Sequence, residues 1–434
     1  MNQARELTPE VVEPGLLIQS GGHDHASLAL MPFIASRDQS DRHGSARFAY
    51  QVHVDDRIRR IAYTMEAGEN GQLPTQYDQP VLLAMLQLWL CDRTPNSPRM
   101  AFRRRQVLEL LRWPDNGQSY RRLTAGLDRL TQLTIKVDTA LIARDGREYG
   151  RGHGAYNLID SFWIGEVRDV ECWLHWGSIV QQAQVIGDLK RLDFGLMMSL
   201  SDPVAAQLYR VLDRVTMSGS STWTVTWQTL AQLVGMRPEA YDKPNRFRSR
   251  LAPRFEQLVQ AGVIDRVDYE RGGRFTFHVR NYLRGHLRRV LAQYGVYDEV
   301  ARQLVAGFDE VRVMVQCDCL QDGNRSKPNA LGGFLTDAIR NDYPLSYPPE
   351  EPAHFVALQG LYSTAELEGY HQAGLRICGY ADDLFASRPD ATAWPLELRA
   401  VVRFMMRHNL DPDQVATTPP GRGPTRMPDP TLES

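Results

Sequence analysis

The feature that most constrains the fold is a pattern of segments that occurs twice, about 125 residues apart. Each copy contains an apolar or amphipathic helix, a short helix and a longer basic helix, followed by strand-like segments around a Gly-rich turn with arginines. Apolar spacings of three and four predict the helices, and β-branched and aromatic runs predict the strands. The repeated order indicates two similar folded units in tandem.

The first copy follows a predicted β-hairpin formed by 47–54 and 57–65. Asp78 is the expected N-cap of its first helix, which is apolar nearly all round and therefore expected to be buried. The segments predicted for this copy are helices 81–90, 106–111 and 119–133 and strands 134–143, 156–164 and 170–176. Three helices before a hairpin with a basic turn are the order of a winged helix-turn-helix.

The second copy repeats this order with one added strand. Its predicted segments are helices 202–215, 227–234 and 244–261 and strands 223–226, 263–269 and 275–280. Pro253 conflicts with an uninterrupted third helix, so we expect a bend there or a helix that begins at Ala252. The spacing of Leu127 and Leu130 in the first copy matches that of Phe255 and Leu258 in the second, which supports a duplication.

The third helix of the first copy has the composition of a helix that reads DNA. Leu123, Leu127 and Leu130 share one side. The opposite side carries Gln118, Arg121, Arg122, Ala125, Arg129 and Gln132. Arginine pairs with guanine and glutamine with adenine in the major groove. Residues 99–136 hold nine basic and three acidic side chains, a net charge of +6 in a chain of net charge −2, which favours DNA binding over the alternative of a solvated polar face.

Further basic side chains are expected to contact DNA around these two helices. The segment 237–254 has six basic and two acidic residues, and its predicted DNA-binding residues are Arg246, Arg248, Arg250 and Arg254. Phosphate contacts are expected from Arg103, Arg104 and Arg105. The two Gly-flanked turns contribute Arg144, Arg147 and Arg151 in the first copy and Arg271 and Arg274 in the second. These turns are expected to reach the minor groove or the backbone, and ordinary solvated loops are the alternative.

The length of 434 residues predicts more than one domain. We expect an α+β protein of two tandem winged helix-turn-helix domains with a mostly helical C-terminal extension. The predicted divisions are a disordered arm (1–45), a first winged-helix domain with its N-terminal hairpin (46–185), a second one (186–285), a helical region (286–416) and a disordered tail (417–434).

Composition argues against secretion and membrane insertion. Five scattered cysteines do not form a disulfide framework, which points to a reducing cytoplasm. No apolar run approaches the ~20 residues of a membrane span, and the first residues lack a signal-peptide pattern.

No arrangement of side chains predicts catalysis, a metal or a cofactor. The phosphate-binding G-x-x-x-x-G-K-[ST] pattern is absent. His23 and His25 resemble the paired histidines of nicking enzymes, but they fall in the predicted arm with Asp24, not an apolar residue, between them. Cys317 and Cys319 lack zinc-site spacing. We therefore expect a protein that is not an enzyme, with no catalytic residue, metal or cofactor.

Several segments resemble the plasmid replication initiator protein A family. They are Gly71–Leu88 (GQLPTQYDQPVLLAMLQL), Ser119–Leu133 (SYRRLTAGLDRLTQL), Asn157–Ile164 (NLIDSFWI) and Leu200–Asp213, and together they cover roughly residues 45–285. Asn329–Leu345 is similar to a short helix that follows the DNA-binding region in several plasmid replication proteins. Pro253 and the long region after 285 depart from that pattern.

The resemblance implies tandem winged helices that bind repeated double-stranded sequences at a plasmid origin. It also implies recruitment of host replication proteins, such as the replicative helicase, and allows a homodimer. Arg121, Arg122 and Arg129 would read bases in the first unit, and Arg246 and Arg250 in the second. The alternatives are a transcriptional repressor of the same fold and, from another class, a nicking or priming enzyme.

Overall fold

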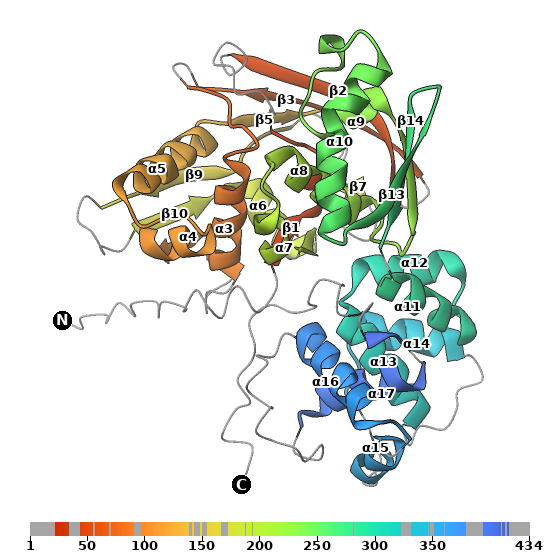
Figure 1. Cartoon of the computed structure of the whole chain (residues 1–434). Helices are drawn as coiled ribbons and strands as arrows, with labels where there is room; N and C mark the ends of the chain where they lie inside the picture. Colours follow the sequence, from red (N-terminus) through yellow and green to blue (C-terminus); the bar gives the residue numbers. More distant parts are fainter. Residues whose placement is uncertain are drawn as a thin grey trace, which may run out of the picture.

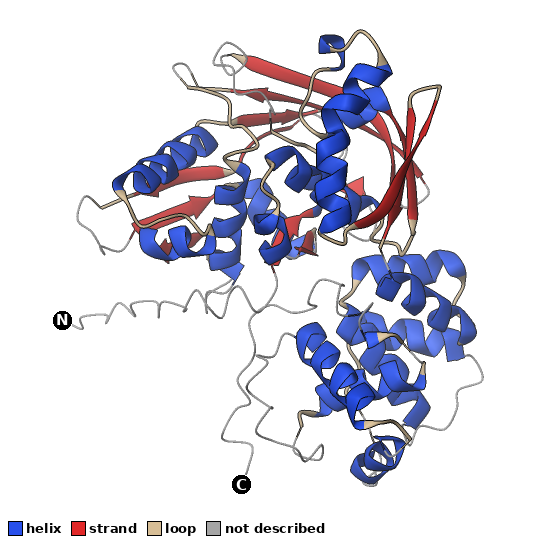
Figure 2. Cartoon of the chain, in the orientation of Figure 1, coloured by secondary structure: helices blue, strands red, loops and turns tan. Residues whose placement is uncertain are grey.

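The computed structural model describes residues 22–33, 44–54, 57–68, 71–90, 97–138, 141–142, 148–149, 154–165, 172–186, 188–192, 194–280, 282–322, 331–345, 347, 351–359, 361–378, 394–408, 410–412 and 415. Helices and sheets mix in the part up to residue 280, and the part beyond it is helical (Figures 1 and 2). Each part has its own hydrophobic core.

The first unit contains a three-stranded sheet in the order β4-β10-β9. Its elements are α3 (Gln79–Leu90), β4 (Arg99–Phe102), α4 (Arg104–Leu110), α5 (Gly117–Thr131), β9 (Ile159–Trp163) and β10 (Cys172–Trp176). Strand β4 was not predicted, because four residues after a proline-containing break carry too little periodicity. The three helices were predicted within two residues of their bounds.

The second unit repeats this order of elements. Its elements are α8 (Pro203–Val215), β12 (Thr222–Thr226), α9 (Trp227–Leu233), the short 3₁₀ helix η2 (Pro238–Ala240), α10 (Pro244–Gln260), β13 (Ile264–Glu270) and β14 (Arg274–Val279). The sheet order β12-β14-β13 matches that of the first unit. Helix α10 continues through Pro253, so the alternative in which the helix begins at Ala252 is wrong.

A four-stranded sheet, β2-β3-β5-β8, joins the two units. Its strands are β2 (Ser45–Val54), β3 (Arg57–Glu66), β5 (Thr134–Val137) and β8 (Gly154–Asn157), and a short pair, β6 (Leu141–Ile142) and β7 (Glu148–Tyr149), forms a sheet of its own. The predicted hairpin at the N-terminus is confirmed. The predicted single strand 156–164 is wrong, because Leu158 separates β8 from β9 and these strands belong to different sheets.

Both units share one hydrophobic core, so the predicted boundary at 185/186 does not separate two cores. Strand β2 lies against the second unit. The amide of Ala49 donates to the Gln232 side chain at 3.0 Å, and the Trp223 indole donates to the carbonyl of His53 at 3.3 Å. These contacts fix the first unit's hairpin on α9 and β12.

An N-terminal segment lies where disorder was predicted. Strand β1 (Gly22–His25) pairs with β11 (Leu189–Leu192), which lies between α6 (Ser178–Ile186) and α7 (Phe194–Ser199), and α2 (Ala26–Ala29) follows β1. The Gln207 side chain donates to the carbonyl of Ala29 at 2.9 Å, and the Tyr63 hydroxyl donates to that of Pro32 at 3.1 Å. The predicted arm 1–45 is therefore wrong for 22–33, because polar partners far along the sequence hold this segment.

The C-terminal part is a bundle of helices around a second core that begins at Leu283. The helices are α11 (Tyr282–Gln293), α12 (Asp298–Gly307), α13 (Glu310–Asp322), α14 (Leu331–Asn341), α15 (Glu351–Gln359), α16 (Thr364–Cys378) and α17 (Leu396–Arg407). The predicted boundary at 285/286 falls inside α11. None of the described helices is both long and apolar enough to cross a bilayer.

Candidate nucleic-acid interface

Helix α5 is positioned by its cap and by its leucines. The Asn116 side chain accepts a hydrogen bond from the amide of Ser119 at 2.9 Å, which satisfies a free donor of the first turn. Leu123, Leu127 and Leu130 are fully buried, as predicted. Gly126 lies against α3, since a Cβ there would be 3.5 Å from Val81. The opposite side of α5 is consequently turned to solvent.

The first half of α5 presents the predicted polar side chains. Gln118, Arg121 and Arg122 are exposed, and Ala125 is half-buried. The Arg122 guanidinium lies 4.1 Å from the centroid of the Trp113 ring, which holds this charge in a defined place. The N-terminal part of such a helix is the part that contacts base edges when it lies in a major groove.

The other predicted residues of α5 point elsewhere. Arg129 donates to both carboxylate oxygens of Asp78, at 2.6 and 3.0 Å, so its side chain is not turned outward with Arg121 and Arg122, and its contact with DNA stays a prediction. Asp78 immediately precedes α3, at the predicted N-cap position, and its side chain also accepts from the amide of Thr75 at 2.9 Å. Gln132 is exposed but lies beside Gly68 and Gly71, at the end of β3. Reading by α5 therefore rests on its first two turns.

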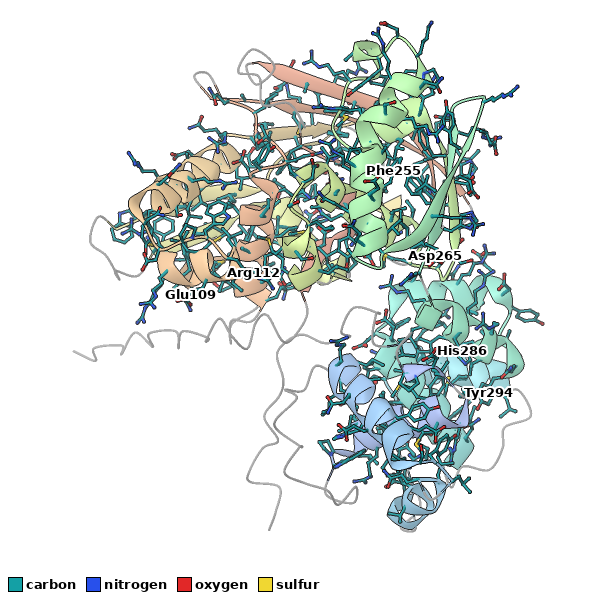
Figure 3. All side chains as sticks on the ribbon, in the orientation of Figure 1. Glu109, Arg112, Phe255, Asp265, His286 and Tyr294 are labelled. Carbon is teal, nitrogen blue, oxygen red and sulfur yellow. The ribbon has the colours of Figure 1, made fainter. Side chains whose placement is uncertain are left out.

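The three arginines predicted to contact phosphates begin α4. Arg103 and Arg105 are exposed, and Arg105 forms an exposed ion pair with Glu109 at 2.9 Å. The Arg104 guanidinium lies 5.0 Å from the centroid of the Tyr120 ring, which brings α4 and α5 together on one surface. Figure 3 marks this end of the molecule with Glu109 and Arg112. Arg112 has a φ of 53°, in the left-handed region that ends α4 and turns the chain toward α5.

Helix α10 presents a second set of exposed arginines: Arg246, Arg248 and Arg250. Arg246 pairs with Asp242 at 2.7 Å while both side chains stay exposed, and Arg248 lies 4.8 Å from the centroid of the Tyr269 ring on β13. Arg254 is different, because it pairs with Asp202 at 2.8 Å at the start of α8 and is only 18% exposed. Arg254 therefore does not belong to the exposed set, and its contact with DNA stays a prediction.

The turn between β13 and β14 lies beside the start of α10. Gly273 has a φ of +79°, and a Cβ there would be 2.6 Å from Trp227 and 3.2 Å from Pro244. Arg271 and Arg274, both exposed, therefore extend from the same end of the unit as α10. Sequence analysis omitted Lys243, the exposed N-cap residue of α10, although Pro244 at the first helical position marks that cap.

The corresponding turn of the first unit is not the predicted one. Arg144, Arg147 and Arg151 lie outside the described residues. In the sequence they fall between β5 and β8, two strands of the four-stranded sheet, and not between strands of the first unit's three-stranded sheet, so the predicted topology is corrected. The turn equivalent to Arg271–Arg274 is the one between β9 and β10. The sequence pattern indicated extended chain before and after Leu158, but it could not show that the two parts belong to different sheets.

The described residues contain no cluster of three or more His, Cys, Asp or Glu side chains able to hold a metal ion. Asp24, between His23 and His25, is bound to Arg210 and Lys190 instead. Cys317 is buried on α13, and burial raises the pKa of its thiol well above the ordinary value. These groups contribute to packing and electrostatic balance.

Comparison with known proteins identifies one family. The family model described as Replication initiator protein A matches residues 23–252, more than half of the chain. Among solved structures, one of RctB domains 2–3 aligns with 13% identity and a TM-score of 0.39 over 58% of this chain and 96% of that chain. A second structure of the same two domains gives 12% identity and a TM-score of 0.39, covering 59% and 98%. No curated protein matches the sequence significantly.

Proposed function

Because the chain belongs to the Replication initiator protein A family, we propose that it is a plasmid replication initiator whose two tandem winged helices bind repeated sequences at an origin. The observation that carries this proposal is the agreement between the units. Both have the sheet order first-third-second strand, and both place an exposed basic helix, α5 or α10, after a shorter helix. This order is the one expected of a winged helix-turn-helix.

The proposed contacts follow from exposure. Gln118, Arg121 and Arg122 of α5 would read bases in one major groove, and Arg246 and Arg250 of α10 in the next, about one helical turn away. Arg103, Lys243 and Arg271 would bind phosphates. Because these contacts release counterions, the affinity should fall steeply as salt rises.

Binding to direct repeats of about 20 base pairs, a length near two helical turns, tests the proposal. We expect the full chain to bind a repeat from beside its gene far more tightly than a scrambled duplex. Arg121→Ala and Arg250→Ala should each weaken binding, while Arg266→Ala, an exposed arginine on the β13 strand, serves as the matched control. Equal affinity for repeat and scrambled duplexes would reject the proposal.

The initiator is proposed to act in the cytoplasm without catalysis, by distorting DNA and recruiting host proteins such as the replicative helicase. A transcriptional repressor of the same fold is the second candidate, because the same contacts serve both. A plasmid that carries only the gene and its flanking repeats should replicate in a suitable host. Failure to replicate with repeat binding intact would favour the repressor.

A nicking or priming enzyme remains the candidate from another class. Supercoiled origin DNA incubated with the protein and Mg²⁺ or Mn²⁺ should stay supercoiled if the proposed mechanism is correct. A site-specific nick would reject the non-enzymatic part of the proposal while leaving repeat binding untouched.

A further inference from the structure

Two tryptophans lie side by side on the outward face of the first unit's three-stranded sheet. Trp163 on β9 and Trp173 on β10 are direct partners in the antiparallel register, so their side chains project from the same face. Trp163 is 46% exposed, more than any other of the chain's eight tryptophans, all of which lie among the described residues. The Arg99 guanidinium lies 5.0 Å from the centroid of the Trp173 ring. The face therefore combines two indoles with a cation.

The second unit shows what the same face looks like without this chemistry. The N-caps of α4 and α9 are Arg103 and Thr226, and aligning them places Ala101 of β4 with Thr224 of β12. The registers then make the cross-strand row Trp163, Trp173, Ala101 equivalent to the row Asp268, Thr276, Thr224. The second unit has short polar side chains in this row, whereas the first unit has two large indole rings. Neither ring belongs to the hydrophobic core.

Charge favours a polyanion as the ligand of this face. Arg99 is exposed on the face, and the basic segment that begins at Arg103 directly follows the end of β4. Among the described residues of β4, β9 and β10, the one acidic side chain is Asp160, which lies 3.4 Å from the Nδ1 atom of His175. Indole rings next to arginine are the combination that stacks on nucleic-acid bases.

The shape and chemistry of the face favour unpaired bases over a major groove as its ligand. A major groove admits a helix or a two-stranded ribbon, and this face spans three strands. Bases inside a duplex also stack on one another, so they are not available to tryptophan. Unpaired bases are open on both sides and bind aromatic rings with little sequence preference.

We propose that Trp163, Trp173 and Arg99 form a binding face for single-stranded DNA, separate from the helices that read the duplex. This inference rests on the proposed function, because an initiator that opens its origin creates a single strand beside the duplex it holds. The first unit would then bind the repeat through α5 and an unpaired strand through the sheet.

Binding of a fluorescein-labelled oligo(dT) of about 20 nucleotides by the full chain tests the proposal. The double variant Trp163→Ala/Trp173→Ala should bind this oligonucleotide about tenfold or more weakly, the loss expected for one or two stacked bases. Trp163→Phe should retain most of the affinity, since a ring remains. Thr224→Ala/Thr276→Ala, on the equivalent face of the second unit, is the matched control and should bind like the wild type.

Intrinsic fluorescence gives an independent readout on the unaltered protein. Oligo(dT) should quench the tryptophan emission of the wild type, and Trp163→Phe should show less quenching at saturation. Duplex repeat binding should be unchanged in every tryptophan variant. If the wild type does not bind the duplex repeat, the proposed function itself is rejected.

Three outcomes would overturn the inference. They are oligo(dT) binding that survives both alanine substitutions, quenching that does not change in Trp163→Phe, and a parallel loss of duplex and oligo(dT) binding in a variant with an unchanged melting temperature. If the double variant does not fold, the single Trp163→Ala variant at the exposed position carries the same test.

Discussion

Asp24 on β1 accepts two hydrogen bonds from the guanidinium of Arg210 on α8, at 2.8 and 2.7 Å, and both side chains are buried. Lys190 on β11 lies 3.4 Å from the same carboxylate and 2.6 Å from Asp213. Asp213 in turn accepts from Arg284 of α11 at 3.4 Å. This chain of buried ion pairs connects the N-terminal strand, the second unit and the C-terminal helices.

Asp24→Asn should destabilise the protein strongly. Burial alone raises the pKa of the Asp24 carboxyl, but Arg210 and Lys190 outweigh burial and hold the pKa below its ordinary value. Removing the charge leaves the buried Arg210 without its carboxylate partner, while Lys190 keeps Asp213, and an uncompensated buried charge costs about 3 to 5 kcal/mol. Urea unfolding measures this loss. Asp242→Asn, which removes the exposed partner of Arg246, is the control and should cost less than about 1 kcal/mol.

Arg129→Ala should reduce the stability of the protein, whereas Arg121→Ala should reduce its affinity for DNA. Arg129 is bound to the nearly buried Asp78, so its loss should lower the free energy of unfolding by about 1 to 3 kcal/mol. Arg121 is exposed, so its loss should reduce DNA affinity and leave thermal stability unchanged. Paired melting and repeat-binding measurements separate the two effects. A stable Arg129→Ala protein with lost sequence preference would restore Arg129 to the reading surface.

Arg122→Ala should reduce sequence-specific binding more than non-specific binding. The Trp113 ring beneath the guanidinium restricts its motion, so the arginine loses little freedom when it pairs with a base. Loss of one bidentate base contact costs about 1 to 3 kcal/mol of discrimination. Competition between repeat and scrambled duplexes measures it. An equal loss on both duplexes would mean that Arg122 contacts phosphate only.

Gly273→Ala should disturb the turn beside α10. Its φ of +79° is strained for alanine, and the new Cβ would be 2.6 Å from Trp227. We expect a loss of about 1 kcal/mol or more in stability and weaker repeat binding. Gly272→Ala is the matched control, since nothing lies within 4 Å of its Cβ position. If both variants bind like the wild type, the position of this turn does not matter for DNA binding.

The C-terminal helices should lose stability in mild acid. Burial, with Arg289 and His408 nearby, lowers the pKa of His286 to about 4 from the ordinary 6.5; Figure 3 places His286 in this helical part. The unfolded chain therefore takes up a proton that the folded protein refuses as the pH falls from 6.5 toward 4, and the stabilisation present above pH 6.5 is lost in that interval. Melting temperatures of wild type and His286→Gln at pH 7 and pH 5 should differ less in the variant. An equal decrease in both would assign the effect to other groups.

Local signals in the sequence were enough for the helices α3, α4, α5, α8, α9 and α10 and for the two groups of exposed arginines on α5 and α10. The leucines of α5 recur at helical spacing and are buried, which also fixes Gln118, Arg121 and Arg122 on the other side. Arg129 lies on the same polar side of α5, but its long side chain turns toward the buried carboxylate of Asp78. The position of Arg129 around the helix axis does not by itself tell whether its side chain is solvated or paired with Asp78.

Strand pairing was the part that local signals could not supply. Residues 154–163 have the composition of one strand, yet they divide between two sheets, and β4 was too short to detect. A strand's partner depends on long-range contacts, so the turn beside α5 could not be assigned from the sequence alone.

By itself, the sequence determined the repeated order of elements, the basic helices α5 and α10 and the family resemblance, because each depends on residues near one another in the chain. Only the tertiary structure showed that the polar segment His23–His25 is part of the folded unit, held there in part by the buried carboxylate of Asp24. Asp24 can be buried only because Arg210, 186 residues away, neutralises it. The paired tryptophans likewise became a surface only when β9 and β10 aligned.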